Sequence, residues 1–374
     1  MRWFVKGERT KNYIEELIKD KGIPYLDFCI QRGYTPLFRC VSSANGEANG
    51  KELLALYSCT KPLTVACVMR LVEEGKLALS DTVEKYLPEY EQAFWLSNGK
   101  ERSAKGEITI ERLLTMTAGL SYNLCTPPIV ELLKNNPAPS TREIVGRYIQ
   151  TPLLFKPGER FEYSLCHDVL GAVVEVVAGK RFSEYMDEVI FKPLGMQNSF
   201  FHRTGAEIFD VYACTQEGGF TPAEKKNMHV FSENHDSGGA GVISCVDDYA
   251  KFAATLACGG VSADGYRLLK KETLDLIRTE RSSLSVNNTF TCIQGEDYGY
   301  GLGVRTRLKP TEWGLPKGEF GWDGAAGSYL MVDSEKQISV VIGMHILEWP
   351  RVFTGEHLRL VECAYEDMRA EGLL

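Results

Sequence analysis

The sequence offers little to a nucleic-acid or membrane partner. Its 42 Lys and Arg residues are outnumbered by 50 Asp and Glu, and the net charge of −8 leaves no basic stripe to neutralise phosphates. No Lys/Arg-rich amphipathic segment is present to dock on acidic lipid. No apolar run approaches the roughly 18–20 residues of a membrane helix. We therefore expect no nucleic-acid partner and no membrane partner.

The patterns of metal, cofactor and disulfide sites are also missing. The six histidines show no metal spacing such as HExxH, and no phosphate-binding Gly-rich loop precedes a helix. Eleven cysteines are scattered singly from Cys29 to Cys363 without a CxxC pair, which is typical of free thiols in a reducing compartment. Met1–Lys21 carries charges throughout and no signal-peptide core. We therefore predict a cytoplasmic protein that uses neither a metal nor a cofactor.

What is present is an ordinary globular composition, 44% hydrophobic and 25% charged, with strand signals at both ends of the chain. Strands are predicted where β-compatible residues gather, at Pro24–Gln31, Thr35–Ser42, Gly299–Arg307, Gly327–Asp333 and Gln337–His345. A closing amphipathic helix is predicted at Gly355–Glu371. Helix-spaced apolar faces fill the middle, at Glu111–Met116, Thr141–Ile149, Asp168–Ala178, Phe182–Ile190, Asp247–Leu256 and Lys271–Thr279.

These signals predict an α/β fold of the α+β type, in which helices flank an antiparallel sheet built from both ends of the chain. Residues 1–76 and 286–374 are expected to form the sheet domain, and residues 77–285 a mostly helical domain. The cleft between the two is the expected place for an active site.

One chemical signal is local. Ser58-Cys59-Thr60-Lys61 opens a helix with an almost entirely apolar interior, and Gly75 suits its C-terminal cap. Residues three apart share a helix face, so the Lys61 amine can reach the Ser58 hydroxyl. The helix N-terminus and burial both lower the pKa of such a lysine, and a neutral lysine can accept the serine proton.

The alternative, non-catalytic interpretation is that Ser58 caps the helix and Lys61 lies on the surface. The chain supplies its own control, because Ser97-Asn98-Gly99-Lys100 has the same spacing, yet Asn-Gly is a turn signal and no apolar helix follows it. A Ser-x-x-Lys match alone is therefore weak. Further motifs are needed to decide for Ser58.

Those motifs occur in order along the chain. They are Ile108–Leu120, which contains Leu113-Leu114-Thr115-Met116-Thr117-Ala118-Gly119-Leu120, then Lys156-Pro157-Gly158, Tyr163-Ser164-Leu165, Pro193-Leu194-Gly195-Met196, Ser237-Gly238-Gly239-Ala240-Gly241 and Gly321-Trp322-Asp323-Gly324. With Ser58 and Lys61, this series resembles the serine β-lactamase-like hydrolases, which include class C β-lactamases, DD-peptidases and family VIII-type esterases. The resemblance runs from about residue 24 to residue 345.

The resemblance implies roles for further residues. Tyr163 matches the tyrosine of the family's Tyr-x-Asn motif, and its phenol is expected to shuttle a proton if a nearby cation stabilises the phenolate. The backbone N–H groups of Ser58 and Ala325 are expected to form the oxyanion hole. The catalytic set is then Ser58, Lys61 and Tyr163.

Two departures from the family pattern bear on the substrate. Trp322-Asp323-Gly324 stands where Lys-Thr-Gly is usual, which removes a cation for a substrate carboxylate and offers Trp322 as an apolar wall. Leu165 replaces the asparagine that would hold a substrate amide. We expect Trp322, Gly324 and Leu165 to contact substrate, and we expect cleavage of a small-molecule carboxylic ester or amide. The sequence does not specify an oligomeric state.

Two alternatives stay open. The same site would also serve a β-lactamase, a DD-peptidase or a D-amino-acid amidase. A catalytically silent binding protein on this fold is the alternative from a different class, although the intact Ser58, Lys61 and Tyr163 disfavour it. His167, close to Tyr163 in sequence, is interpreted as structural, and His235-Asp236-Ser237-Gly238-Gly239 as the edge of a glycine-rich loop.

Overall fold

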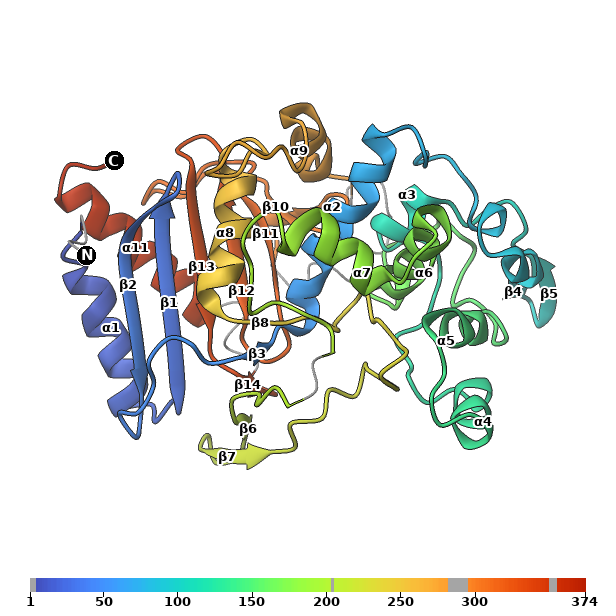
Figure 1. Ribbon diagram of the computed structural model, residues 1–374, viewed down its shortest axis with the longest axis horizontal. Helices are drawn as coiled ribbons and strands as arrows, with labels where there is room; N and C mark the ends of the chain where they lie inside the picture. Colours follow the sequence, from blue (N-terminus) through green and yellow to red (C-terminus); the bar gives the residue numbers. More distant parts are fainter. Residues whose placement is uncertain (1–4, 203–204, 282–294, 350–354) are drawn as a thin grey trace.

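The computed structural model describes residues 5–202, 205–281, 295–349 and 355–374. Its main feature is a seven-stranded antiparallel sheet that joins the two ends of the chain (Figure 1). In spatial order the strands are β2 (Thr35–Ser43), β1 (Tyr25–Arg32), β13 (Ile338–Gly343), β12 (Tyr329–Asp333), β11 (Phe320–Asp323), β10 (Arg305–Arg307) and β9 (Tyr298–Tyr300). The predicted fold class is confirmed.

Both faces of this sheet are covered, which is why its central strands are apolar throughout. Along β13, Val340 and Ile342 pack into one hydrophobic cluster while Val341 between them packs into another. Helices α1 (Glu8–Lys19) and α11 (His357–Ala370) lie side by side over the first face, and α8 (Val246–Ala257) covers the second (Figure 1).

The helical part of the chain lies beside the sheet (Figure 1). It is built around α2, whose residues are buried along nearly its whole length and contact both the other helices and β11. Its helices are η1 (Tyr57–Cys59), α2 (Thr60–Glu73), η2 (Val83–Lys85), η3 (Pro88–Gln92), α3 (Ile110–Leu114), α4 (Pro127–Asn135), α5 (Thr141–Tyr148), α6 (Cys166–Ala178), α7 (Phe182–Met186), η4 (Asp187–Phe191) and α9 (Lys271–Arg278).

Some sequence predictions need correction. The run at residues 299–307 is not one strand but two, β9 and β10, because Gly303 turns the chain with φ 75. Several short strands were not predicted: β3 (Leu54–Ala55) with β8 (Ile243–Ser244), β4 (Phe94–Ser97) with β5 (Lys100–Ser103), and β6 (Val211–Cys214) with β7 (Phe220–Ala223) and β14 (Ile346–Leu347). The Asn98-Gly99 pair does form the turn it indicates, between β4 and β5.

Three further expectations concern the whole chain. The domain boundary at residue 76 stays a prediction, and the one at residue 285 lies outside the described residues. The described cysteines are free thiols, and Cys292 lies outside the described part. Among the helices of the described residues, none combines the length and the hydropathy of a bilayer crossing.

Candidate active site

Ser58 lies at the entrance to α2, in the short turn η1. The residue before it, Tyr57, has φ 46, a backbone conformation that a bulky side chain rarely adopts. Such strain persists where surrounding packing fixes it, and it is frequent at functional sites. The Ser58 side chain ends in a nearly closed environment, with 7% of the residue exposed.

Lys61 follows one turn later and is almost completely buried, with 1% exposed. Its Nζ donates to Ser58 Oγ at 3.0 Å and to the Gly239 carbonyl at 2.9 Å. Burial lowers the pKa of Lys61, because an ammonium loses its hydration inside the protein. The Lys61 amine therefore lies within hydrogen-bonding distance of the Ser58 hydroxyl, and its pKa is lowered.

Tyr163 reaches the same hydroxyl from the loop before α6. Its phenol donates to Ser58 Oγ at 2.8 Å, and Lys61 Nζ lies 4.8 Å from the centre of its ring. Burial raises the pKa of Tyr163, so the phenol keeps its proton near neutral pH. Ser58 Oγ thus lies between an amine whose pKa is lowered by burial and a phenol whose pKa is raised by burial.

Trp322, on β11, supports the phenol. Its indole N–H donates to the Tyr163 hydroxyl at 3.3 Å, and its ring stacks on the Tyr163 ring with centroids 5.6 Å apart. Tyr300 packs edge-on against the indole, with ring centroids 5.2 Å apart. Because only 2% of Trp322 is exposed, its contacts fix Tyr163 rather than present a broad apolar surface.

The turn after β11 lies against the backbone that leads to Ser58. A Cβ on Gly324 would stand 2.3 Å from the Leu56 carbonyl oxygen, so only glycine allows this approach. Ala326 is buried against Ala55 and Tyr57. Ala325, between Gly324 and Ala326 in the sequence, is exposed. The segment expected to supply the second oxyanion donor therefore adjoins the segment that carries Ser58.

The comparisons with known proteins agree with this geometry. The family model described as Beta-lactamase matches residues 10–362. The chain belongs to the beta-lactamase family. Esterase EstB from Burkholderia gladioli is 29% identical over 316 residues, which cover 78% of this chain and 76% of EstB.

Solved structures show the same fold. EstCE1, a hydrolase with promiscuous acyltransferase activity, superposes with a TM-score of 0.77 and 25% identity, covering 96% of this chain and 98% of its own. Simvastatin synthase (LovD) from Aspergillus terreus gives a TM-score of 0.73 at 21% identity, covering 97% and 98%. At that identity the second likeness concerns the fold alone.

Leu165, which replaces the asparagine usual in this beta-lactamase family, is buried in the hydrophobic core with 3% exposed. The polar partner of Lys61 is instead the Gly239 carbonyl. Gly239 lies in a loop that is fixed to α6 by Ser237, whose Oγ donates to the buried Asp168 carboxylate at 2.6 Å. A Cβ on Gly239 would stand 2.6 Å from Asp168 Oδ2, so the glycine lets the loop approach the carboxylate.

Two aromatic residues near Ser58 were not predicted from the sequence. Tyr122 packs against Tyr163 with ring centroids 5.3 Å apart. His229 packs against Tyr122 at 5.4 Å, and burial, with the nearby Lys61 charge, lowers the pKa of His229 to about 4. Tyr122 closely follows the Ala118-Gly119-Leu120 motif, a signal that points to it. His229 has no such signal.

His167, interpreted from the sequence as structural, is fully buried on α6 beside Gly303 of the β9–β10 turn. Burial lowers the pKa of His167 well below its usual value, which keeps the ring neutral. It makes no contact with Ser58 in the described network.

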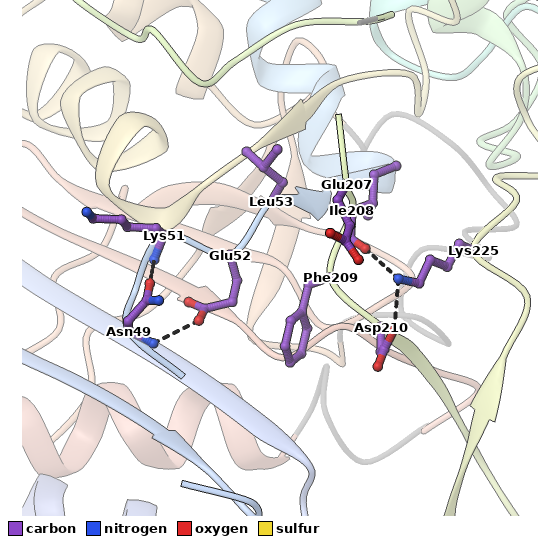
Figure 2. Close-up of a pocket in the computed structure, with 9 residues that line it drawn as sticks. All are labelled: Asn49, Lys51, Glu52, Leu53, Glu207, Ile208, Phe209, Asp210 and Lys225. Atoms are coloured by element: carbon purple, nitrogen blue, oxygen red, sulfur yellow. Dashed lines mark hydrogen bonds and ion pairs between the residues drawn. The ribbon is translucent and has the colours of Figure 1, made fainter. Parts of the chain in front are cut away.

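A separate pocket of about 360 Å³ lies around Asn49, Glu52, Phe209 and Lys225 (Figure 2). Its charges are engaged locally: Glu52 accepts the Asn49 N–H at 2.8 Å, and Lys225 donates to the Ile208 carbonyl at 2.8 Å (Figure 2). Ser58 does not line it. In the described part of the chain, no three His, Cys, Asp or Glu side chains are grouped to hold a metal ion.

Proposed function

We propose that this protein is a serine hydrolase that cleaves small carboxylic esters through an acyl-enzyme on Ser58. The observation that carries the proposal is the Ser58 hydroxyl, which accepts hydrogen bonds from the Lys61 amine at 3.0 Å and the Tyr163 phenol at 2.8 Å. The likeness to the esterase EstB and to the hydrolase EstCE1 supports the same reading.

In the acylation step, neutral Lys61 accepts the proton of Ser58 as Oγ attacks the ester carbonyl. The carbonyl oxygen becomes an oxyanion, for which the backbone N–H groups of Ser58 and Ala325 are the proposed donors. As the intermediate collapses, Tyr163 gives its proton to the departing alkoxide. Lys61 is now an ammonium, with Nζ 4.8 Å from the centre of the Tyr163 ring, and it returns a proton to the Tyr163 phenolate.

Deacylation reverses these roles with water in place of the alcohol. A water molecule gives a proton to the Lys61–Tyr163 pair and attacks the acyl carbon, and the Ser58 oxygen leaves as a hydroxyl. Proton gain and loss balance over the cycle, so these three side chains account for both steps.

The residues around Ser58, Lys61 and Tyr163 favour esters over β-lactams and peptides as substrates. Asp323, at the position usually held by threonine, pairs with Arg305 at 3.1 Å. Trp322 replaces the usual lysine, and Leu165 offers no amide to a substrate. Ester cleavage needs none of these missing groups, since its leaving alcohol requires only a proton.

A substrate panel tests the proposal. Purified protein should hydrolyse p-nitrophenyl acetate or butyrate far faster than nitrocefin, a D-Ala-D-Ala peptide or a D-amino-acid amide. Ser58→Ala should abolish the hydrolysis, by on the order of 10⁴-fold or more. Preferred turnover of nitrocefin or of the peptide would move the assignment to another activity of the family. Tight ligand binding without turnover of any substrate would identify a binding protein.

A further inference from the structure

We propose that His357, the first residue of the C-terminal helix α11, is a positioning residue for the oxyanion hole. It contacts neither Ser58 nor the other proposed catalytic side chains in the described network. It acts instead on the turn that carries Ala325. The inference rests on the proposed function, because it assigns a purpose to that turn only if Ser58 is acylated.

The turn runs from the end of β11 to the start of β12 and is closed by two backbone hydrogen bonds. The Gly324 N–H donates to the Ser328 carbonyl at 2.7 Å, and the Gly327 N–H donates to the Gly324 carbonyl at 2.8 Å. The exposed Ala325 lies between these bonds. A small displacement of either end would therefore move the Ala325 N–H.

The His357 side chain contacts both ends of this turn. Its ring is fully buried, with Nδ1 3.3 Å from Asp323 Oδ1 and Nε2 3.0 Å from the Gly327 carbonyl oxygen. Asp323 immediately precedes the turn and Gly327 ends it. Tyr329, on β12, packs on the ring with centroids 4.7 Å apart and fixes its plane.

Two partners of the His357 ring are oxygen acceptors, the Asp323 carboxylate at Nδ1 and the Gly327 carbonyl at Nε2. The buried Arg305 donates to the other oxygen of the Asp323 carboxyl group at 3.1 Å. Arg305 also pairs with the buried Glu319 at 3.3 Å, so its guanidinium joins two carboxyl groups.

This network gives a reason for aspartate at the middle position of Trp322-Asp323-Gly324. One carboxylate links β10, through Arg305, to α11, through His357. Threonine would offer one hydroxyl and no charge to the same two partners. The side chain that distinguishes this motif thus faces away from Ser58 and fixes the strand that borders it.

The test compares His357→Phe with a matched variant on the same helix. His357→Phe keeps an aromatic ring but loses both ring nitrogens and their contacts with Asp323 and Gly327. Tyr365→Phe also removes a buried hydrogen bond between α11 and the sheet, to Asp333 at 2.8 Å, but does so away from the turn. We expect His357→Phe to lower kcat on p-nitrophenyl acetate about 10²-fold with KM changed less than about threefold, because a misplaced oxyanion donor acts in the transition state. Tyr365→Phe should retain kcat within about twofold.

A second measurement, inhibition by a boronic acid, distinguishes a displaced oxyanion hole from a general loss of stability. A boronic acid forms a tetrahedral adduct on a serine and places an oxygen in the oxyanion hole, so its inhibition constant should rise in parallel with the fall in kcat. Binding of the product acid should not change. If His357→Phe does not fold, His357→Gln is measured against the same criteria, with at least a tenfold fall in kcat expected.

The outcomes distinguish this inference from the proposed function. If wild-type protein hydrolyses esters and a folded His357 variant keeps kcat and boronate affinity within about threefold, the inference is wrong and the proposed function stands. An equal loss in Tyr365→Phe also overturns it, since helix packing would then explain the effect. If wild-type protein hydrolyses no ester, the inference falls together with the proposed function.

Discussion

Replacing Lys61 by methionine should nearly abolish activity while leaving the fold intact. Methionine has a similar length and no charge, so it fills the same space on α2. The substitution removes the amine that donates to Ser58 Oγ at 3.0 Å and to the Gly239 carbonyl at 2.9 Å. It therefore separates the chemical role of Lys61 from its packing role.

The two effects have different sizes. Loss of a positioned general base lowers the rate by about 10²- to 10⁴-fold, which corresponds to about 3–5 kcal/mol of activation free energy. For stability, leaving the Gly239 carbonyl without its donor costs about 1–3 kcal/mol. Removing a buried amine abolishes its desolvation cost, which raises the free energy of unfolding by a similar amount, about 1–3 kcal/mol. The free energy of unfolding should therefore change by less than about 2 kcal/mol.

The assay pairs kcat/KM for p-nitrophenyl acetate with urea unfolding of the same preparations. A Lys61→Met protein that unfolds near the wild-type urea concentration but has lost at least 10²-fold in kcat/KM meets the expectation. Activity within tenfold of wild type would exclude Lys61 as the general base, because another group would then deprotonate Ser58. Loss of activity only through loss of the folded protein would also contradict it.

Four further predictions concern the same framework. Tyr163→Phe should lower kcat by about 10²- to 10⁴-fold in steady-state kinetics, and unchanged turnover would exclude its proton role. Because burial lowers the pKa of Lys61, kcat/KM should rise with pH along a limb centred below the usual value of about 10.4, and a limb at or above that value in a pH profile would contradict the mechanism. Gly324→Ala should destabilise the protein by about 1–3 kcal/mol in urea unfolding, since its Cβ would meet the Leu56 carbonyl at 2.3 Å, whereas Gly355→Ala, with open space around it, should not. Burial of Asp236 opposes its charge, but hydrogen bonds from His202, Ser183 and Arg181 prevail and lower its pKa to about 2. Asp236→Asn should therefore lose about 2 kcal/mol at pH 7, and the difference from wild type should shrink as pH falls from about 4 through about 2; a constant difference would argue against this pKa.

Sequence reasoning finds what is local along the chain. Ser58 and Lys61 are one helical turn apart, so the spacing of two residues is enough to bring an amine to a hydroxyl. The β1–β2 hairpin is equally local, with a turn at Gly33 between two apolar runs. The antiparallel sheet followed from strand signals at the two ends of the chain.

Other parts of the site depend on the fold or on the family. Tyr163 lies 105 residues from Ser58, and only the resemblance to known hydrolases joined them. The partner of Lys61 at Gly239 is a backbone carbonyl, which leaves no side-chain signature. The contacts of His229 and His357 arise from tertiary packing, so no spacing in the sequence indicates them. The β9–β10 turn was missed because Tyr300, Leu302 and Val304 around it all suit a strand.

The central claim is that Ser58 carries the acyl group, and mapping a covalent adduct tests it most directly. The protein is treated with a fluorophosphonate, its intact mass is measured, and the modified peptide is sequenced by tandem mass spectrometry. We expect a single adduct on Ser58 that forms in wild type and is absent in Ser58→Ala. An adduct on any other residue, or equal labelling of Ser58→Ala, would contradict it.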